Sequence, residues 1–130
     1  MTVVFTNGCF DILHRGHVEL LRYCSSIGDQ VVVGLNSDDS VTRLKGPTRP
    51  IVCQDDRKVL LESLQFVDKV IIFCDDTPIN LIKSLGPDII VKGGDYSVNE
   101  VVGYPEYEVR IFEYVKGQST TKIVNCLIDR

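Results

Sequence analysis

The sequence has few of the features that mark membrane-spanning or nucleic-acid-binding proteins. No apolar run approaches the roughly 20 residues that span a bilayer, so we expect no membrane partner. The 14 basic residues are scattered among 18 acidic ones, the net charge is −4, and no basic patch indicates nucleic acid as a partner. An anionic ligand would therefore be held by local groups rather than by a positive field of the whole protein.

Two further absences concern the cysteines and the phosphate-binding loops. No GxxxxGK[ST] segment is present, which argues against an ordinary P-loop kinase or NTPase. The N-terminal residues predict a strand rather than a secretory leader, and no CxxC pair occurs. An odd number of cysteines without such pairs indicates reduced thiols, so we expect a cytoplasmic protein. The five are Cys9, Cys24, Cys53, Cys74 and Cys126.

The residues that are present predict a single α/β domain over 1–130. Apolar residues make up 44% and charged residues 25%, the balance of a globular protein. Helical spacing and capping residues alternate with short apolar runs, which is typical of a Rossmann-like, doubly wound, five-stranded parallel sheet with helices on both faces. Strands are predicted at 2–6, 30–35, 68–73, 88–91 and 109–112, and helices at 17–27, from 55 or 56, at 78–85 and from 119.

Three finer predictions concern the connections and one helix face. Residues 36–54 are polar and contain two proline turns, so we predict an irregular loop. In the helix after it, Val59, Leu60 and Leu64 are expected to face the core, with Leu61 as a further candidate. Residues 98–102 are expected to contain a short helical turn.

Polar segments follow four of the predicted strands. They are residues 7–17, 36–49, 92–96 and 117–121, and they contain both histidines and the loop lysines. In an open parallel sheet, ligands bind outside the carboxyl ends of the strands. The sequence therefore predicts one polar cleft at this edge.

The stretch TNGCFDILHRGH, from Thr6 to His17, has the clearest chemical signal. His14 and His17 are three residues apart at a predicted helix start, where both rings share a face and the N–H groups and dipole favour an anion. Gly16 between them lets a ligand approach. Two alternatives remain: a zinc-binding pair, although no third ligand lies at the usual spacing, and two ordinary helix-start histidines.

Phosphate chemistry explains more of the polar segments. Displacement at an α-phosphate needs positioned donors more than a protein nucleophile. Lys45 on a flexible loop and the hydroxyl groups of residues 119–121 are suitable donors. Each also has a structural alternative: Lys45 and Arg49 as solvated charges, residues 92–95 as a tight turn, 119–121 as a helix cap, and Arg57 paired with a nearby carboxylate.

Several separated motifs occur together in this chain. The segments TNGCFDILHRGH, VGLNSDDSVTRLKGPTRP, VKGGDY and STTKI, between Val3 and Ile123, resemble the cytidylyltransferase-like nucleotidyltransferases with an HxGH signature. Within that family, RLKGPTRP and VKGGDY are most similar to the adenylyltransferases of ADP-heptose synthesis in lipopolysaccharide production. Those enzymes transfer AMP from ATP to D-glycero-β-D-manno-heptose 1-phosphate and release pyrophosphate.

The resemblance implies roles for the matching residues. His14, His17 and Lys45 would be catalytic, holding the nucleotide phosphates and stabilising the transition state. Other nucleotide-binding residues would be Asn7, Gly8, Phe10, Asp11, Gly16, Gly94, Asp95, Ser119, Thr120 and Thr121. Substrate-binding or supporting residues would be Asp38, Arg49, Arg57 and Lys92.

The resemblance also implies partners. Mg²⁺ is expected to arrive with the nucleoside triphosphate, with no metal held by protein side chains. A homodimer is expected. Related modules are fused to a sugar kinase in many bacteria, so we expect a separate kinase to supply the sugar phosphate to this chain.

Two other functions stay open. One is a cytidylyltransferase acting on glycerol 3-phosphate or another alcohol phosphate, although such relatives generally lack the KGPTRP loop at Lys45 to Pro50. The other is a non-catalytic nucleotide-binding regulator, against which the intact set of His14, His17, Lys45 and Thr120 counts.

Overall fold

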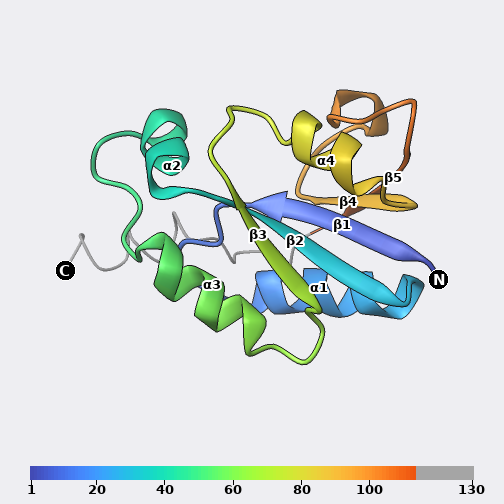
Figure 1. Ribbon diagram of the computed structural model, residues 1–130, viewed down its shortest axis with the longest axis horizontal. Coiled ribbons are helices and arrows are strands. Elements are labelled where there is room, and N and C mark those ends of the chain that lie inside the picture. Colours follow the sequence, from blue (N-terminus) through green and yellow to red (C-terminus); the bar gives the residue numbers. More distant parts are fainter. Residues whose placement is uncertain (114–130) are drawn as a thin grey trace.

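Five parallel strands form one sheet in the order β3-β2-β1-β4-β5 in the computed structural model, which describes residues 1–113 (Figure 1). The predicted Rossmann-like α/β fold is confirmed. The predicted helix from residue 119 lies outside the described residues. The strands are β1 (Val3–Gly8), β2 (Gln30–Asn36), β3 (Lys69–Phe73), β4 (Ile89–Gly93) and β5 (Glu108–Phe112). The helices are α1 (Arg15–Ile27), α2 (Asp38–Lys45), α3 (Gln54–Glu62), α4 (Ile79–Leu85) and the 3₁₀ turn η1 (Val98–Glu100).

The strand order creates a switch point between β1 and β4. From β1 the chain moves outward through α1 to β2 and then to β3, and α4 returns it to β4 on the opposite side of β1. β1 pairs with β2 from Val3↔Gln30 to Gly8↔Leu35 and with β4 at Val4↔Ile89 and Phe5↔Ile90. Connections that leave neighbouring strands in opposite directions open a crevice at their carboxyl ends.

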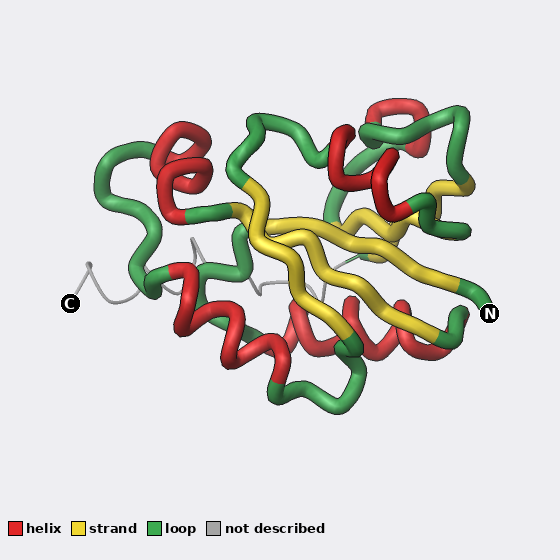
Figure 2. The backbone as a smooth tube through the Cα atoms, in the orientation of Figure 1, coloured by secondary structure: helices red, strands yellow, loops and turns green. Residues whose placement is uncertain are grey.

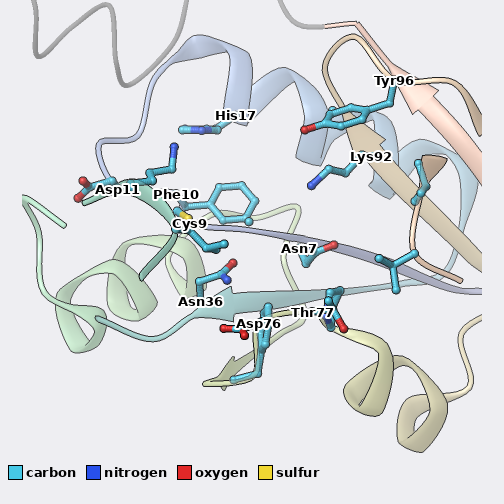
Figure 3. Close-up of a pocket in the computed structure, with 18 of the residues that line it drawn as sticks. Asn7, Cys9, Phe10, Asp11, His17, Asn36, Asp76, Thr77, Lys92 and Tyr96 are labelled. Carbon is cyan, nitrogen blue, oxygen red and sulfur yellow. The ribbon is translucent and has the colours of Figure 1, made fainter. Parts of the chain in front are cut away.

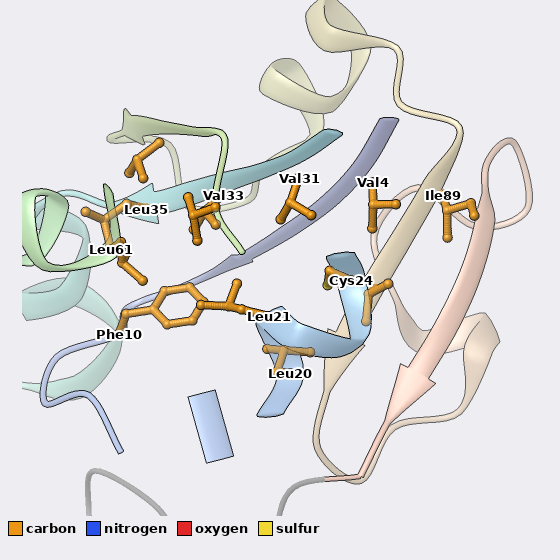
Figure 4. Packing of buried hydrophobic residues seen from close by; sticks show 13 residues of the cluster. Val4, Phe10, Leu20, Leu21, Cys24, Val31, Val33, Leu35, Leu61 and Ile89 are labelled. Atoms are coloured by element: carbon orange, nitrogen blue, oxygen red, sulfur yellow. The ribbon is translucent and has the colours of Figure 1, made fainter. Parts of the chain in front are cut away.

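Helices lie on both faces of the sheet (Figure 2). The sheet separates two hydrophobic clusters. On one face, α1 and α3 pack against Val4, Val31 and Val33 (Figure 4). On the other face, Phe5 and Val32 pack with Ile82 of α4. Gly34 is needed in β2 because a Cβ there would lie 2.8 Å from the Phe5 ring. Residues 31–35 are buried throughout, which explains their continuous apolar pattern.

The structure corrects the prediction that residues 36–54 form an irregular loop, because α2 occupies part of this segment. Ser37 caps the helix by accepting a hydrogen bond from the Ser40 N–H, and Gly46 follows the last residue with a φ of 105°. Ser40 and Val41 are the buried residues of α2. A helix of eight residues with so short an apolar face has no periodic pattern, although its caps were readable. Lys45 ends this helix rather than standing on a flexible loop.

The prediction for the buried face of α3 was wrong for Val59 and Leu60 and is confirmed for Leu61. Val59 and Leu60 are 62% and 46% exposed, whereas Leu61 and Arg57 are buried. Leu64 packs, partly buried, beyond the helix end. An arginine at a core position breaks the apolar period, so counting apolar residues placed Val59 and Leu60 on the wrong face. The short helical turn within 98–102 is confirmed by η1.

Candidate active site

A cleft of about 510 Å³ lies at the carboxyl edge of the sheet (Figure 3). Its walls come from the ends of β1 to β4 and from the segments that follow them. Figure 3 shows His17 and Phe10 on one side, Lys92 and Tyr96 on another, and Asp76 and Thr77 beyond Asn36. This volume falls within the range of small-molecule sites, and the position is the switch point between β1 and β4.

The two histidines are held by a capping box at the start of α1. His14 is the N-cap, and its Nδ1 accepts a hydrogen bond from the Gly16 N–H at 3.0 Å. The His14 N–H in turn donates to Nδ1 of His17 at 3.3 Å. The two rings stack with centroids 3.8 Å apart and planes at 26°. Because each Nδ1 is an acceptor, the neutral form of each ring carries its proton on Nε2.

The turn before α1 supports His17 from beneath. Phe10 is buried and its ring centroid lies 5.0 Å from that of His17. Phe10 has a φ of 45°, an uncommon conformation for a residue with a side chain, and such strain is often found at functional sites. The Phe10 ring folds back over Gly8, where a Cβ would lie 3.1 Å from the ring. The apolar ring thus orients an imidazole that lines the cleft.

Burial keeps both imidazoles neutral. It lowers the pKa of His17 to about 3, with help from the nearby His14 and Lys45. Burial also lowers the pKa of His14. At neutral pH the pair therefore offers Nε2–H donors without carrying charge.

Cations and a thiol face the cleft from the other elements. Lys45 ends α2, and Lys92 in β4 places its Nζ 5.4 Å from the centre of the Tyr96 ring. Burial lowers the pKa of Lys92, an effect that Cys9 opposes and Lys45 reinforces. Burial raises the pKa of the Cys9 thiol despite the nearby Lys45, Arg57 and Lys92, which argues against a reactive thiolate.

Asp11 organises the chain after α2. Its carboxylate accepts hydrogen bonds from the N–H groups of Ile51 and Val52 at 2.9 Å and from Nε of Arg49 at 2.7 Å. Burial would raise the pKa of Asp11, but these bonds and the Arg49 charge outweigh it and lower the pKa. The carboxylate therefore ties residues 49–52 to the cleft.

Arg57 is a fully buried structural link. Its side chain donates to the carbonyl groups of Val52, Cys9 and Asn36 and to Oδ1 of Asp38 at 2.7–2.9 Å. These four acceptors belong to three stretches of the chain around the cleft, at residue 9, residues 36–38 and residue 52. The predicted alternative, in which Arg57 pairs with a nearby carboxylate, is confirmed, and that carboxylate is Asp38. Both residues support the walls rather than bind substrate directly, since neither lines the cleft.

Comparison with known protein families is consistent with a nucleotide site at this edge of the sheet. The model of the family described as Cytidylyltransferase-like matches residues 5–124. The chain belongs to the cytidylyltransferase-like family. The predicted class of enzyme, a nucleotidyltransferase, is thereby confirmed.

Relatives and one solved structure resemble most of the chain. It is 57% identical over 126 residues to the bifunctional protein HldE of Campylobacter fetus, covering 95% of this chain and 27% of that protein. It is 54% identical over 123 residues to the HldE of Helicobacter pylori, covering 94% and 27%. The chain thus spans about a quarter of the length of these curated relatives. The lipopolysaccharide core biosynthesis protein of Thermoplasma volcanium is 29% identical with a TM-score of 0.73, covering 91% of this chain and 99% of that one.

The cleft brings together nine of the residues singled out from the family resemblance. Gly16 lies beside them at the helix start, but Gly94 and the exposed Asp95 do not line the cleft. Ser119, Thr120 and Thr121 lie outside the described residues. The nine are Asn7, Gly8, Phe10, Asp11, His14, His17, Lys45, Arg49 and Lys92.

Sequence reasoning missed the contribution of the third strand and of the residues that follow the predicted segment 92–96. Phe73, Asp76, Thr77 and Pro78 follow or end β3, which the four predicted segments left out. The polar run DDTP directly after a buried strand was a readable signal. The lining residues Val101 and Val102 were not readable, because nothing in the local sequence separates them from core residues. Leu44 and Tyr96 also line the cleft and lie inside the predicted segments 36–49 and 92–96.

Metal, membrane and disulfide expectations can be compared with residues 1–113. Within this range no three His, Cys, Asp or Glu side chains form a metal-binding group. No helix in it has the length and apolar character to cross a membrane. Cys9, Cys24, Cys53 and Cys74 are free thiols, and Cys126 lies outside the described residues.

Proposed function

We propose that this domain transfers AMP from ATP to D-glycero-β-D-manno-heptose 1-phosphate and releases pyrophosphate. The observation that carries the proposal is the pair of stacked imidazoles, whose Nδ1 atoms accept local N–H groups and whose Nε2 atoms therefore carry the protons. Two such donors at a helix N-terminus suit a polyphosphate.

The reaction requires no nucleophile from the protein. An oxygen of the acceptor phosphate attacks the α-phosphorus of ATP in line with the leaving group. The new P–O bond forms as the bond between the α-phosphorus and the bridging oxygen breaks, and the electron pair leaves with pyrophosphate. Negative charge spreads over the equatorial oxygens, where the Nε2–H groups of His14 and His17 donate hydrogen bonds and Lys45 supplies positive charge.

Neutral imidazoles are well suited to this role. Two stacked imidazolium ions 3.8 Å apart would repel each other, whereas neutral rings can share one site. Burial holds both pKa values below their usual range, so the donors keep their protons on Nε2 at physiological pH. The pair then stabilises charge that develops during reaction without needing to gain or lose a proton.

Mg²⁺ remains part of the proposal as a companion of the triphosphate. The side chains nearest the proposed phosphate path are imidazoles and lysines, and the Asp11 carboxylate is already engaged by Arg49, Ile51 and Val52. This donor set fits an ion coordinated mainly by phosphate oxygens and water. Such an ion would supply charge neutralisation of the pyrophosphate leaving group.

The acceptor is proposed from the sequence and the relatives. The KGPTRP loop lies beside the cleft, with Lys45 and Arg49 lining it. The names of the HldE relatives and of the lipopolysaccharide core biosynthesis protein support a heptose acceptor. We further propose that the domain works as a cytoplasmic homodimer and that a sugar kinase activity supplies the phosphorylated acceptor, in keeping with the bifunctional name of the HldE relatives.

A pyrophosphate-release screen tests the proposal. Purified protein is mixed with each of the four NTPs and with a panel of sugar 1-phosphates and polyol phosphates, glycerol 3-phosphate included. We expect release with ATP and the heptose 1-phosphate. Selective release with CTP and glycerol 3-phosphate would replace the proposed substrates with the cytidylyltransferase pair.

A further inference from the structure

The side chain of Arg49 has a donor that the fold does not use. Among the described residues, two buried side-chain atoms have no hydrogen-bond partner, Oγ1 of Thr6 and Nη2 of Arg49. Thr6 lies inside β1, but Arg49 lines the cleft. A buried N–H of a charged group is costly to leave unpaired, so a group that binds in the cleft is the natural partner.

The Arg49 guanidinium is held in place. Its side chain is 10% exposed, and its Nε donates to the Asp11 carboxylate at 2.7 Å. That carboxylate is itself held by the N–H groups of Ile51 and Val52. A planar guanidinium anchored through Nε has a defined orientation for its terminal nitrogens, and this preorganisation lowers the entropy cost of binding.

Asp11, Arg49 and the N–H groups of residues 51 and 52 together form what we call the Asp11 clamp. The charged side chains around this clamp favour an anion over a neutral ligand. Asp11 neutralises Arg49 formally, but Lys45 and Lys92 line the same cleft without an ion pair to a carboxylate within 4.0 Å among residues 1–113. Cationic side chains that converge on one space favour an anion between them. A phosphate monoester has three terminal oxygens that a guanidinium can bind through more than one N–H group.

We propose that Arg49 binds the phosphate monoester of the acceptor and that Asp11 is its positioning residue. This inference rests on the proposed function, in which the imidazole pair holds the phosphates of the nucleotide. Arg49 enters the cleft from the chain that follows α2, whereas the imidazoles belong to the start of α1. The acceptor phosphate would thus be held by a different stretch of the chain from the one that carries the imidazole pair.

Steady-state kinetics on the full chain test this assignment. In Arg49→Gln, which removes the charge and the fork, we expect the KM for the heptose 1-phosphate to rise roughly 10- to 100-fold, the loss of charge-assisted hydrogen bonds. The KM for ATP should stay within about twofold. Arg49→Lys keeps the charge without the fork and should lie in between. Asp11→Asn should raise the same KM, because it releases the guanidinium.

Arg22→Gln is the matched control. Arg22 is an exposed arginine of α1 that pairs with Glu19 and does not line the cleft, so neither KM should change. Thermal unfolding shows which variants are folded. Should Arg49→Gln not fold, Arg49→Lys decides the question, and an unchanged acceptor KM in it would overturn the inference.

The failure of this inference differs from the failure of the proposed function. If the unmodified chain releases pyrophosphate but Arg49→Gln leaves the acceptor KM unchanged, or raises only the KM for ATP, the inference is wrong and the function stands. If the unmodified chain releases none with any pair, the function is wrong. Calorimetric titration with inorganic phosphate then decides: roughly tenfold weaker binding by Arg49→Gln supports a phosphate residue, and equal binding overturns it.

Discussion

The HxGH turn, residues 14–17, and the segment after α2, residues 46–57, shape the cleft through different kinds of hydrogen bond. In the turn, the stabilising hydrogen bonds join residues two or three positions apart, from Gly16 to His14 and from His14 to His17. After α2, Arg49 reaches Asp11 across 38 positions, and Arg57 reaches the Cys9 carbonyl across 48. Both regions orient polar groups toward the same cleft.

The contrast between local and long-range hydrogen bonds distinguishes residues proposed to act on the substrate from residues that hold the cleft together. The turn needs only local sequence to set the tautomers of its histidines, so its geometry follows from capping at a helix start. The hydrogen bonds of Arg49 and Arg57 form only when segments distant in the sequence are already folded together. We therefore expect substitutions of His14 or His17 to affect mainly turnover. Substitutions of Asp11, Arg49 or Arg57 should affect mainly stability or acceptor binding.

Among the substitutions considered, Arg57→Ala should have the largest effect on stability, because it removes the long-range hydrogen bonds of Arg57. The change leaves one buried and two half-buried carbonyl groups without their arginine donor and removes the partner of Asp38. We expect the free energy of unfolding to fall by about 3–5 kcal/mol, as for removal of one partner from a buried polar network. Urea denaturation measures this. Glu62→Ala, at the exposed end of α3, should change it by less than about 0.5 kcal/mol.

Among the substitutions considered, His17→Ala should have the largest effect on turnover, because it removes one imidazole of the HxGH pair. Loss of one donor to the transition state is expected to lower kcat by about 10²- to 10³-fold, with a folded protein shown by circular dichroism. The pyrophosphate-release assay measures kcat, and Arg22→Gln is again the control. Activity close to that of the unmodified chain would remove His17 from the proposed mechanism.

Acid should destabilise the turn before it affects the Asp11 clamp. Because burial lowers the pKa of His17 to about 3, the unfolded chain, with a usual value near 6.5, binds the proton first. Stability is then full above pH 6.5 and decreases as pH falls toward 3. At pH 5 the expected loss from His17 is about 2 kcal/mol, from about 1.4 kcal/mol per pH unit.

The lowered pKa of His14 adds in the same direction, whereas Asp11, with a lowered pKa, loses its contribution only below its unfolded value of 3.8. Denaturation curves at pH 7.5 and 5 measure the slope in the unmodified chain and in His17→Gln. An equal slope in both would mean that His17 is not held neutral by burial.

Ser37→Ala should have the smallest effect, since it removes one local cap from α2. Oγ of Ser37 accepts from the Ser40 N–H, and loss of an N-cap costs about 1 kcal/mol. Thermal or urea unfolding measures the change. Ser84→Ala, at an exposed serine of α4, is the comparison and should stay within about 0.5 kcal/mol. A loss above about 2 kcal/mol would show that α2 depends on this cap more than a single hydrogen bond explains.

The same contrast explains which predictions succeeded. The five strands were readable because buried parallel strands are continuous apolar runs. The HxGH turn was readable because its two rings and the glycine are neighbours in sequence. α2 was missed because its short apolar face has no period, and α3 was misoriented because Arg57 occupies a core position. The partners of the Asp11 carboxylate were not readable, because no local pattern indicates that Arg49 and the N–H groups of residues 51 and 52 donate to it.

The sequence by itself determined the α/β alternation, the edge of the sheet where the cleft lies and the identity of the histidine pair, since each depends on periodicity or on neighbours in the chain. Only the tertiary structure decided that Arg57 is structural, that Asp11 holds Arg49, and that the segment after β3 completes the cleft. These outcomes depend on hydrogen bonds and packing between segments tens of residues apart. Which distant acceptor meets a given donor is set by the folded sheet, and a side chain's type alone does not specify it.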